Sequence, residues 1–485
     1  MNAVLKTLRW PANERDTRRL ALWTADEAAK AVGGRASAAF QASGVEMDSR
    51  DVRSGDLFFA LKGESSDGHL YVDKAFSNGA IAAVVEQPIA QPHILVNDTN
   101  RALERLAAAA RQRADACVIG VTGSVGKTGV KEAIFASLER GSKGRAHRSV
   151  RSYNNHVGVP LSLARMPSRS RFGVFEMGMN HAGEILDLSA QVRPHVAVVT
   201  TIAPAHIENL GSEEAIADAK AEIFAGLQPG GTAVIPADSP HFARLRAAAE
   251  RQGARVLSFG RSADAGIRLL DAIPAANGGS LVTAALADTR LCYSVAEPGE
   301  HWVANSLAVM AAVHAAGSDL GAAGLALAEM GGLKGRGARH WIAVPGGQAL
   351  LIDESYNANP ASMRATLAQL GATPATRRIA VLGSMKELGD FAPAFHAQLL
   401  EPLADAQVDY AVLVGDEMQA LARELGKPGS NTLGKGIAYA HCGNPGEAIA
   451  ALEEFGLTGG DAVLVKGSNS VGLGRLVAHF ATREG

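Results

Sequence analysis

The stretch from Cys117 to Leu138 constrains the fold of this chain more than any other. It begins with the apolar run CVIGV, continues through the small-residue turn TGSVGKT, and ends in a segment with Val130, Ile134 and Leu138 at helical spacing. A buried strand, a glycine-rich turn and a helix in that order build a cradle in which backbone N–H groups face a phosphate. The sequence therefore predicts an α/β domain with an anion site at the end of one strand.

The turn does not match the strict G-x-x-x-x-G-K-[ST] pattern, because Val121 stands five positions before Gly126. It keeps the parts on which the chemistry depends. Glycines let backbone N–H groups approach an anion, a lysine can reach terminal phosphates, and a threonine hydroxyl can ligate Mg²⁺. The structural alternative is a glycine turn with an exposed lysine. The predicted cradle comprises Thr122, Gly123, Ser124, Gly126, Lys127 and Thr128.

Apolar runs without polar alternation recur along the chain. FGVFEMG, HVAVVTTI and GGTAVIPA predict parallel strands with both sheet faces covered. ALLIDES, RIAVLGS, YAVLVGD and DAVLVKGS predict a second doubly wound unit after the glycine-rich segment 331–337. The predicted class is α/β with three domains: a small mixed α/β N-terminal domain (1–108), a central P-loop-type parallel-sheet ATPase domain (109–333) and a C-terminal Rossmann-like domain (334–485).

Composition narrows the function classes. A net charge of -2 argues against a general nucleic-acid or membrane-surface binder. The three cysteines form no C-x-x-C pair, so we expect neither a disulfide framework nor a zinc site, which fits a reducing cytoplasm. The first residues lack the apolar core of a signal peptide, and no apolar run is long enough to cross a bilayer. We expect a cytoplasmic monomer that neither binds nucleic acid nor inserts into a membrane.

Three further side chains are candidates for metal or charge chemistry. Glu176 ends an apolar strand, so its carboxylate is expected at the sheet edge where α/β proteins bind ligands and could hold Mg²⁺ there. His206 follows another such strand, although a lone histidine is as often a structural hydrogen-bonder. Lys220 lies four residues after Ile216 and four before Phe224, on the buried stripe of its predicted helix. It is either a functional lysine, neutralised by modification, or a side chain that snorkels to the surface.

Eight segments, in this order, resemble motifs of the Mur ligases of peptidoglycan synthesis: Gly120–Thr128, NNHVGVP, FEMGMNHAGEI, APAHIENLG, DAKAEIF, GEHWVANSLAVMAA, DESYNANPASM and LGSMKELGD. The last two are most similar to the member that joins D-alanyl-D-alanine to UDP-N-acetylmuramoyl-tripeptide. The resemblance extends from about Met47 to about Gly472. It implies a first domain that holds the UDP-sugar, a middle ATPase domain, and a last domain that admits the incoming amine and closes over ATP.

The resemblance also implies roles for matching residues. Lys127 and Thr128 match ATP and Mg²⁺ residues, and Glu176 and His206 match ligands of a second metal ion. Lys220 matches the lysine that the family carbamylates, and a carbamate is an anion that can help to hold two Mg²⁺ ions. The implied catalytic set is therefore Lys127, Lys220, His206 and Glu176, and the implied metal set is Thr128, Glu176, His206 and Lys220.

Nucleotide and substrate contacts follow from the same comparison. Asn305 matches the adenine side, Arg336 matches the arginine after the linker with Arg339 as the alternative, and Asp353, Tyr356 and Asn357 match the ribose and base side. On the substrate side, Asn154 and Asn155 match the loop that faces the muramoyl peptide. Lys466 and Ser468 are expected to seat the dipeptide. The residues assigned to the uridine diphosphate are Ser49, Arg50, Lys62, Asp67 and His69. One departure is Gly129, which stands where the family usually has Thr or Ser.

The implied reaction activates a carboxylate before it meets an amine. The terminal carboxylate of the tripeptide attacks the γ-phosphate of ATP, and the amine of D-alanyl-D-alanine then attacks the acyl phosphate. The segment 331–337 is the expected hinge for closure. Alternatives are a sister ligase that adds another amino acid, a folate-type polyglutamate ligase, a nucleotide-dependent conformational switch and an inactive scaffold. The DSR…DGH pattern of the first domain argues against the folate type.

Overall fold

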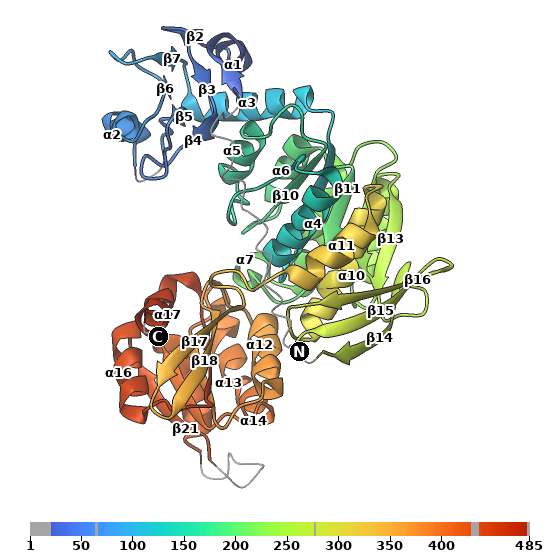
Figure 1. Ribbon diagram of the computed structural model, residues 1–485, viewed down its shortest axis with the longest axis vertical. Coiled ribbons are helices and arrows are strands. Elements are labelled where there is room, and N and C mark those ends of the chain that lie inside the picture. The colour runs from blue at the N-terminus through green and yellow to red at the C-terminus, as the bar shows by residue number, and fades with distance from the viewer. Residues whose placement is uncertain (1–20, 64–65, 276–277, 428–435, 483–485) are drawn as a thin grey trace, which may run out of the picture. The chain divides into compact units, whose positions relative to one another are not determined.

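The structure is a computed structural model that describes residues 21–63, 66–275, 278–427 and 436–482 (Figure 1). Contacts divide the chain into two compact units, Met1–Ala114 with Pro160–Ser168, and Asp115–Val159 with Arg169–Gly485. The N-terminal stretch that argued against a signal peptide lies outside the described residues. Within the described ranges, no helix has both the length and the apolar character that crossing a membrane requires.

The first unit is built on a five-stranded sheet of order β2-β7-β6-β5-β4, parallel except for β2. Its strands are β2 (Arg35–Ala36), β4 (Gly44–Glu46), β5 (Asp56–Phe59), β6 (Ala82–Val85) and β7 (His93–Leu95), beside the short pair β1 (Trp23–Thr24) and β3 (Gln41–Ala42). The helices are α1 (Ala25–Val32), α2 (Val72–Ser77) and α3 (Thr99–Arg113). The predicted boundary after residue 108 falls inside α3, and the exact domain ranges stay a prediction.

The segment 160–168 belongs to this first unit although it lies far along the chain. Trp23 Nε1 donates to Ala164 O over 2.9 Å, and Arg165 forms a 2.6 Å ion pair with Glu46. Both partners of that pair are largely buried, which makes it less screened than a surface pair. These contacts explain why the segment clusters with the N-terminal residues.

The larger sheet of the second unit has nine strands in the order β16-β15-β14-β13-β12-β11-β8-β10-β9. The seven strands from β9 to β14 are parallel, and β14, β15 and β16 are antiparallel. Bounds are β8 Cys117–Thr122, β9 Ala146–Arg148, β10 Phe172–Glu176, β11 Val196–Val199, β12 Thr232–Pro236, β13 Arg255–Gly260, β14 Ile267–Pro274, β15 Ser280–Leu286 and β16 Thr289–Val295. The apolar runs predicted to be parallel strands are therefore confirmed.

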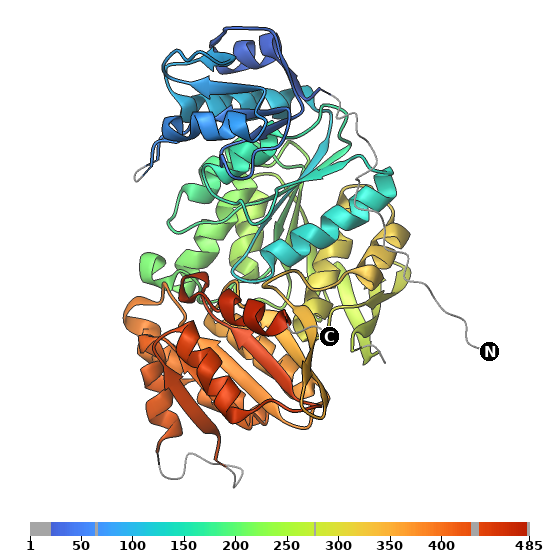
Figure 2. The same cartoon turned by 60° about the vertical axis from the view of Figure 1, so that its left-hand side comes forward.

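Helix α4 (Lys127–Ser142) lies across this sheet, as Figure 2 shows, and packs against α10 (Glu300–Ala315) and α11 (Leu320–Glu329). Val130, Ile134 and Leu138 are fully buried, as their helical spacing predicted. The remaining helices of this part are α6 (Glu184–Val192), α7 (Ile207–Leu210), α8 (Glu213–Ala221) and α9 (Phe242–Arg251), whereas α5 (Gly158–Ala164) lies mostly in the segment 160–168 of the first unit.

The helix that carries Lys220 is shorter than its apolar stripe predicted. Ser212 caps α8 by accepting from Ala215 N, and the α-helix ends at Ala221. The chain continues as a 3₁₀ turn, Glu222–Gly226, whose tighter winding buries Ile223 and Phe224 without a further α-helical turn. The position of Lys220 on the buried face is unaffected.

A second sheet in the same unit has the order β17-β18-β22-β19-β20-β21, parallel except for the β17–β18 hairpin. Its strands are β17 Ala338–Val344, β18 Gly347–Glu354, β19 Arg378–Gly383, β20 Tyr410–Val414, β21 Ala438–Cys442 and β22 Ala462–Lys466. The helices are α12 (Pro360–Ala372), α13 (Ala392–Ala397), α14 (Leu400–Asp405), α15 (Gln419–Leu425), α16 (Pro445–Phe455) and α17 (Gly474–Ala481). The α/β class with mostly parallel sheets is thus confirmed.

Candidate active site

The second unit contains a cavity of about 370 Å³ at the carboxyl ends of its parallel strands. The glycine-rich turn after β8 forms one part of its wall, and the ends of β18 and β22 form another. This is the edge at which α/β sheets bind their ligands. Predicted site residues in its lining are Ser124, Gly126, Lys127, Asn154, Asn155, Glu176, His206, Asn305, Arg336, Tyr356, Asn357 and Lys466.

The turn between β8 and α4 depends on glycine at two positions. Gly123 has φ +147° and Gly126 has φ +87°, and a Cβ at Gly123 would lie 2.0 Å from Thr200 Oγ1. Ser124 fixes the turn from the other side, since its hydroxyl donates to Ala203 O over 2.8 Å. Thr122 is buried beneath, and its hydroxyl has no hydrogen-bond partner among the described residues. The backbone of the turn is therefore held open toward the cavity.

Lys127 begins α4 and folds back over this turn. Its ammonium donates to Gly123 O over 2.7 Å. Burial lowers the pKa of Lys127, while the carboxylate of Glu176 opposes that effect. A lysine held at the first residue of the helix lies where a terminal phosphate would meet the helix N-terminus.

A second cluster joins strand β10 to the same turn. Glu176 is 1% exposed, and its two carboxylate oxygens accept from the Thr128 hydroxyl over 2.9 Å and from Asn154 Nδ2 over 2.8 Å. Asn155 caps the following helix through Gly158 N, at 2.9 Å. The structure thus brings three of the predicted side chains, those of Thr128, Asn154 and Glu176, into direct contact.

Lys220 is 1% exposed, so the prediction of a buried lysine is confirmed and the snorkelling alternative is wrong. Burial lowers the pKa of its ammonium well below the usual value, and the positive charge of Lys127 lowers it further. Among the described residues, no hydrogen bond or ion pair compensates this ammonium. A buried and uncompensated lysine is strongly biased toward its neutral form.

His206 has a partner that the sequence did not predict. Its Nδ1 lies 2.5 Å from a carboxylate oxygen of Glu387, in the LGSMKELGD segment. Both residues have positive φ, +61° for His206 and +65° for Glu387. Two non-glycine residues in that region indicate a strained and specified geometry. The close contact with His206 and the charges of His206 and Lys127 lower the pKa of the Glu387 carboxyl.

Arg336 and Tyr356 form the side of the cavity that was assigned to the base and ribose. The Arg336 guanidinium lies over the Tyr356 ring, 4.3 Å from its centroid, and the Tyr356 hydroxyl contacts that of Ser152. Arg336 lines the cavity, whereas Arg339 lies within β17 outside that lining, so the geometry favours Arg336.

The side chain of Asp353 forms its hydrogen bonds with neighbouring residues of the chain. It accepts from Gly335 N over 2.8 Å and from the Ser355 hydroxyl over 2.6 Å. It lines a neighbouring cavity together with Thr128 rather than the one described above. Its present contacts fix the turn that carries Arg336.

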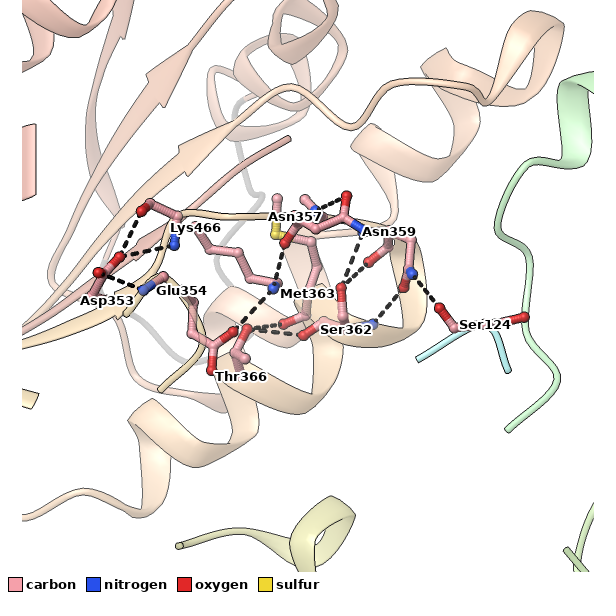
Figure 3. Close-up of polar contacts among 12 residues, drawn as sticks. Ser124, Asp353, Glu354, Asn357, Asn359, Ser362, Met363, Thr366 and Lys466 are labelled. Atoms are coloured by element: carbon pink, nitrogen blue, oxygen red, sulfur yellow. Dashed lines mark hydrogen bonds and ion pairs between the residues drawn. The ribbon is translucent and has the colours of Figure 1, made fainter. Parts of the chain in front are cut away.

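Lys466 lines the cavity and is 2% exposed, and Figure 3 shows its side chain between Asn357 and Glu354. Its ammonium donates to Asn357 O over 2.9 Å and lies 3.5 Å from Glu354. Ser468 is near the same strand end, and its hydroxyl accepts from Lys386 N over 3.0 Å. Figure 3 also shows Asn359, which caps α12 and reaches Ser124 O over 3.4 Å. The beginning of α12 is thereby joined to the glycine-rich turn.

The residues assigned to uridine diphosphate lie in the first unit and are described by themselves. Lys62 forms a 2.5 Å ion pair with Glu86, and His69 accepts from Glu86 N over 3.0 Å. His69 is also 2.6 Å from Asp67, so three predicted residues meet around Glu86. Ser49 and Arg50 are held elsewhere: Ser49 O accepts from Asn78 Nδ2 over 2.7 Å, and Arg50 pairs with Asp48 at 2.6 Å.

Within the described ranges, no three His, Cys, Asp or Glu side chains lie close enough together to hold a metal ion. The oxygen donors Thr128 and Glu176 suit Mg²⁺, which takes one or two protein carboxylates and completes its shell with phosphate and water. His206 and Lys220 fit a second ion only if the lysine gains a carboxylate, because an ammonium is not a ligand.

Three family descriptions match the sequence in succession. The Mur ligase family catalytic domain matches residues 41–114, the Mur ligase middle domain matches 121–313, and the Mur ligase glutamate ligase domain matches 340–469. A UDP-N-acetylmuramoyl-tripeptide–D-alanyl-D-alanine ligase from Synechocystis sp. is 36% identical over 441 residues, which is 89% of this chain and 90% of that protein. This chain belongs to the Mur ligase family. A relative of the same name from Escherichia coli is 35% identical and covers 79% of the chain and 83% of its own length.

Solved structures of the family agree with the fold. MurF from Acinetobacter baumannii is 30% identical, with a TM-score of 0.80 over 95% of this chain and 99% of that one. MurF from Thermotoga maritima, solved in complex with ADP, is 26% identical, with a TM-score of 0.71 over 91% of this chain and 97% of that one.

Sequence reasoning missed several residues of this Mur ligase's cavity. Glu354 ends a buried strand, the same signal that indicated Glu176, and Asn359 precedes a proline, which is typical of a helix cap. His301 and Trp302 also line the cavity, and Glu387 contacts His206, but the motifs that contain these residues gave no sign of those positions. Trp302 also explains the unusual Gly129, because a Cβ at position 129 would lie 3.0 Å from the indole ring.

Substituting Gly126 tests whether the open turn is required for nucleotide binding. In Gly126→Ala the left-handed backbone would be strained by about 1–2 kcal/mol, and the new Cβ would lie 2.9 Å from Asn305 Oδ1. The turn or Asn305 must then shift. We expect the affinity for ADP, measured by calorimetry, to fall about tenfold or more.

The matched control is Gly230→Ala, since Gly230 also has positive φ, +74°, but has no atom within 4 Å of the added Cβ. It should lower the melting temperature and leave ADP affinity unchanged. Equal ADP affinity in the two variants would contradict the role given to the turn.

Proposed function

We propose that this chain is an ATP-dependent ligase that joins D-alanyl-D-alanine to the terminal carboxylate of UDP-N-acetylmuramoyl-tripeptide in peptidoglycan precursor synthesis. The observation that carries the proposal is the single cavity that holds the phosphate cradle at Lys127 and the strand-end residues Glu354 and Lys466. A cavity of that kind lets a phosphorylated carboxylate and an amine meet without leaving the protein. The names of the relatives supply the substrates.

The chain's own residues account for the first half of the reaction. Backbone N–H groups of the turn 123–128 and the N-terminus of α4 hold the nucleotide phosphates. The carboxylate oxygen of the tripeptide forms a bond to the γ-phosphorus, ADP leaves, and Lys127 neutralises charge that builds on the transferred group. Lys127 can do so because its ammonium lies over the turn rather than in solvent.

Mg²⁺ is proposed at Thr128, with Glu176, His206 and a modified Lys220 holding a second ion. When bound, Mg²⁺ neutralises charge on the transferring phosphoryl group. Asn154 fixes one oxygen of Glu176 by donating to it over 2.8 Å, which leaves the carboxylate oriented before any ligand binds. Preorganised donors and acceptors of this kind cost no rearrangement during the reaction.

Carbamylation of Lys220 is supported by its surroundings. Only a neutral amine reacts with CO₂, and burial lowers the pKa of this lysine well below its usual value. The amine nitrogen bonds to the carbon of CO₂ and releases a proton, which gives an anionic carbamate. The product would be an anion, which the positive charge of Lys127 would stabilise.

The second half of the reaction needs an amine and the exclusion of water. The dipeptide nitrogen attacks the acyl carbon, the bond from that carbon to the phosphate oxygen breaks, and inorganic phosphate leaves. Lys466 and Ser468 are proposed to seat the dipeptide, and Ser49, Arg50, Lys62, Asp67 and His69 the uridine diphosphate. We likewise propose that the nucleotide is contacted by Asn305, Arg336, Asp353, Tyr356 and Asn357. The cytoplasmic location, the monomeric state and the three domain ranges are also proposals.

The direct test combines ATP and Mg²⁺ with UDP-N-acetylmuramoyl-tripeptide and D-alanyl-D-alanine, singly and together. We expect ADP release to require both substrates and a UDP-N-acetylmuramoyl-pentapeptide to form in equal amount, as measured by coupled assay and mass spectrometry. Replacing the dipeptide with a single amino acid is the control for a sister ligase. ADP release that is indifferent to both substrates would instead support a nucleotide-dependent switch.

The carbamate has its own test. With ¹³C-labelled bicarbonate at neutral pH, the protein is expected to show a carbamate carbonyl signal by NMR that is absent from Lys220→Met. Lys74→Met, which removes an exposed lysine of α2, should keep the signal. A signal that survives in Lys220→Met would rule out this site.

A further inference from the structure

The carboxylate of Glu354 is a buried acid for which the reaction above has no use. It ends β18, and the register pairs it with Lys466, the last residue of the parallel neighbour β22. Its side chain is 17% exposed and lines the cavity. Parallel strands that end together place both side chains at the ligand-binding edge of the sheet.

Glu354 lacks the partners that a buried carboxylate normally has. In the described part of the chain, its one hydrogen bond comes from Lys466 Nζ, at the long distance of 3.5 Å. That ammonium is better engaged by the Asn357 carbonyl at 2.9 Å (Figure 3). A buried carboxylate usually accepts two or more short hydrogen bonds or pairs closely with a cation. The vacant oxygen therefore suits a ligand that brings its own N–H donors and positive charge.

The proposed reaction supplies such a ligand and needs such a group. The α-amino group of a dipeptide is mostly an ammonium at neutral pH, with a pKa of about 8, and an ammonium has no lone pair with which to attack. A proton must leave before the bond to the acyl carbon can form. The acceptor must lie in the cavity that also holds the acyl phosphate.

We propose that Glu354 binds the ammonium of the incoming amine and accepts its proton. This inference rests on the proposed ligase function. The N–H bond breaks and its proton moves to Glu354, which becomes a neutral acid, while the nitrogen keeps the electron pair. That pair forms the amide bond and the carbon–oxygen bond to phosphate breaks. The second proton of the nitrogen leaves with inorganic phosphate, and Glu354 returns its proton to water after product release.

Burial makes the Glu354 carboxylate a stronger proton acceptor than an exposed carboxylate. Burial raises the pKa of its carboxyl, and the positive charges of Lys466 and Arg336 oppose that rise. A general base is most effective when its pKa lies near the working pH. His301 also lines the cavity, but burial and Lys466 lower its pKa to about 4, which makes it a poor acceptor. The charged and titratable groups that act on this pocket are Lys466, Arg336, Asp353, Glu297 and His301.

The test separates the two halves of the reaction in Glu354→Gln. Hydroxylamine is largely uncharged at neutral pH, so it can intercept the acyl phosphate as a hydroxamate without a proton acceptor. We expect hydroxamate formation within about twofold of wild type and a kcat for dipeptide ligation lowered about 100-fold at pH 7. Ligation by the variant should rise roughly tenfold per pH unit up to about pH 8, as the free amine accumulates, whereas the wild-type profile is flatter.

Two further variants complete the design. Glu354→Asp keeps a proton acceptor and should ligate the dipeptide about tenfold faster than Glu354→Gln. If Glu354→Gln does not fold, Glu354→Asp takes its place: it should form hydroxamate at the wild-type rate and ligate the dipeptide more slowly than wild type. Glu424→Gln makes the same chemical change in an exposed pair with Lys427 and should alter neither rate.

Normal dipeptide ligation by Glu354→Gln at pH 7 would overturn the assignment, and so would an equal loss of hydroxamate and dipeptide product. A wild-type protein that makes no hydroxamate with ATP and UDP-N-acetylmuramoyl-tripeptide would overturn the proposed function itself. The failures of the two claims are therefore distinguishable.

Discussion

Charge buried at the carboxyl ends of parallel strands is the constraint on which the site depends. Glu176, Glu354 and Lys466 end parallel strands, Lys127 follows another, and Lys220 is buried within helix α8. Each charge costs free energy unless a neighbour compensates it. Two short hydrogen bonds compensate Glu176 within the chain, whereas Glu354 has only a long contact with Lys466 and Lys220 has no hydrogen bond among the described residues. Groups whose charge is incompletely compensated can bind or react with a ligand, and we propose a phosphate at Lys127, CO₂ at Lys220 and an amine at Glu354.

The glycine-rich turn connects this chemistry to the fold. The left-handed backbone at Gly126 allows Asn305 of α10 to approach the turn, and Gly129 allows the Trp302 indole to pack against the first turn of α4. Asn359 reaches the same turn from the start of α12. Three helices from distant parts of the sequence are therefore positioned by one short loop, and a side chain at either glycine would disturb them.

The local pattern of the sequence predicted the strands and helices well, and the long-range side-chain contacts less well. Apolar runs located the parallel strands, and helical spacing placed Lys220 on a buried face, because burial and period are properties of a short segment. The pairing of His206 with Glu387 could not be predicted in this way. The two residues are far apart in sequence, and they meet through loops whose positive φ is set by tertiary contacts. Glu354 was predictable in principle, since it ends a strand as Glu176 does. The family motif assigned a role to the neighbouring Asp353 instead, and Glu354 was given none.

Transfer of oxygen from the tripeptide to phosphate tests the central claim, that the γ-phosphate activates a carboxylate. The terminal carboxylate of UDP-N-acetylmuramoyl-tripeptide is labelled with ¹⁸O, and the phosphate released during ligation is analysed by mass spectrometry. If the carboxylate attacks the γ-phosphorus, one labelled oxygen leaves with each phosphate for each amide formed. Phosphate without label would mean that water cleaves ATP and that the nucleotide changes only the shape of the protein.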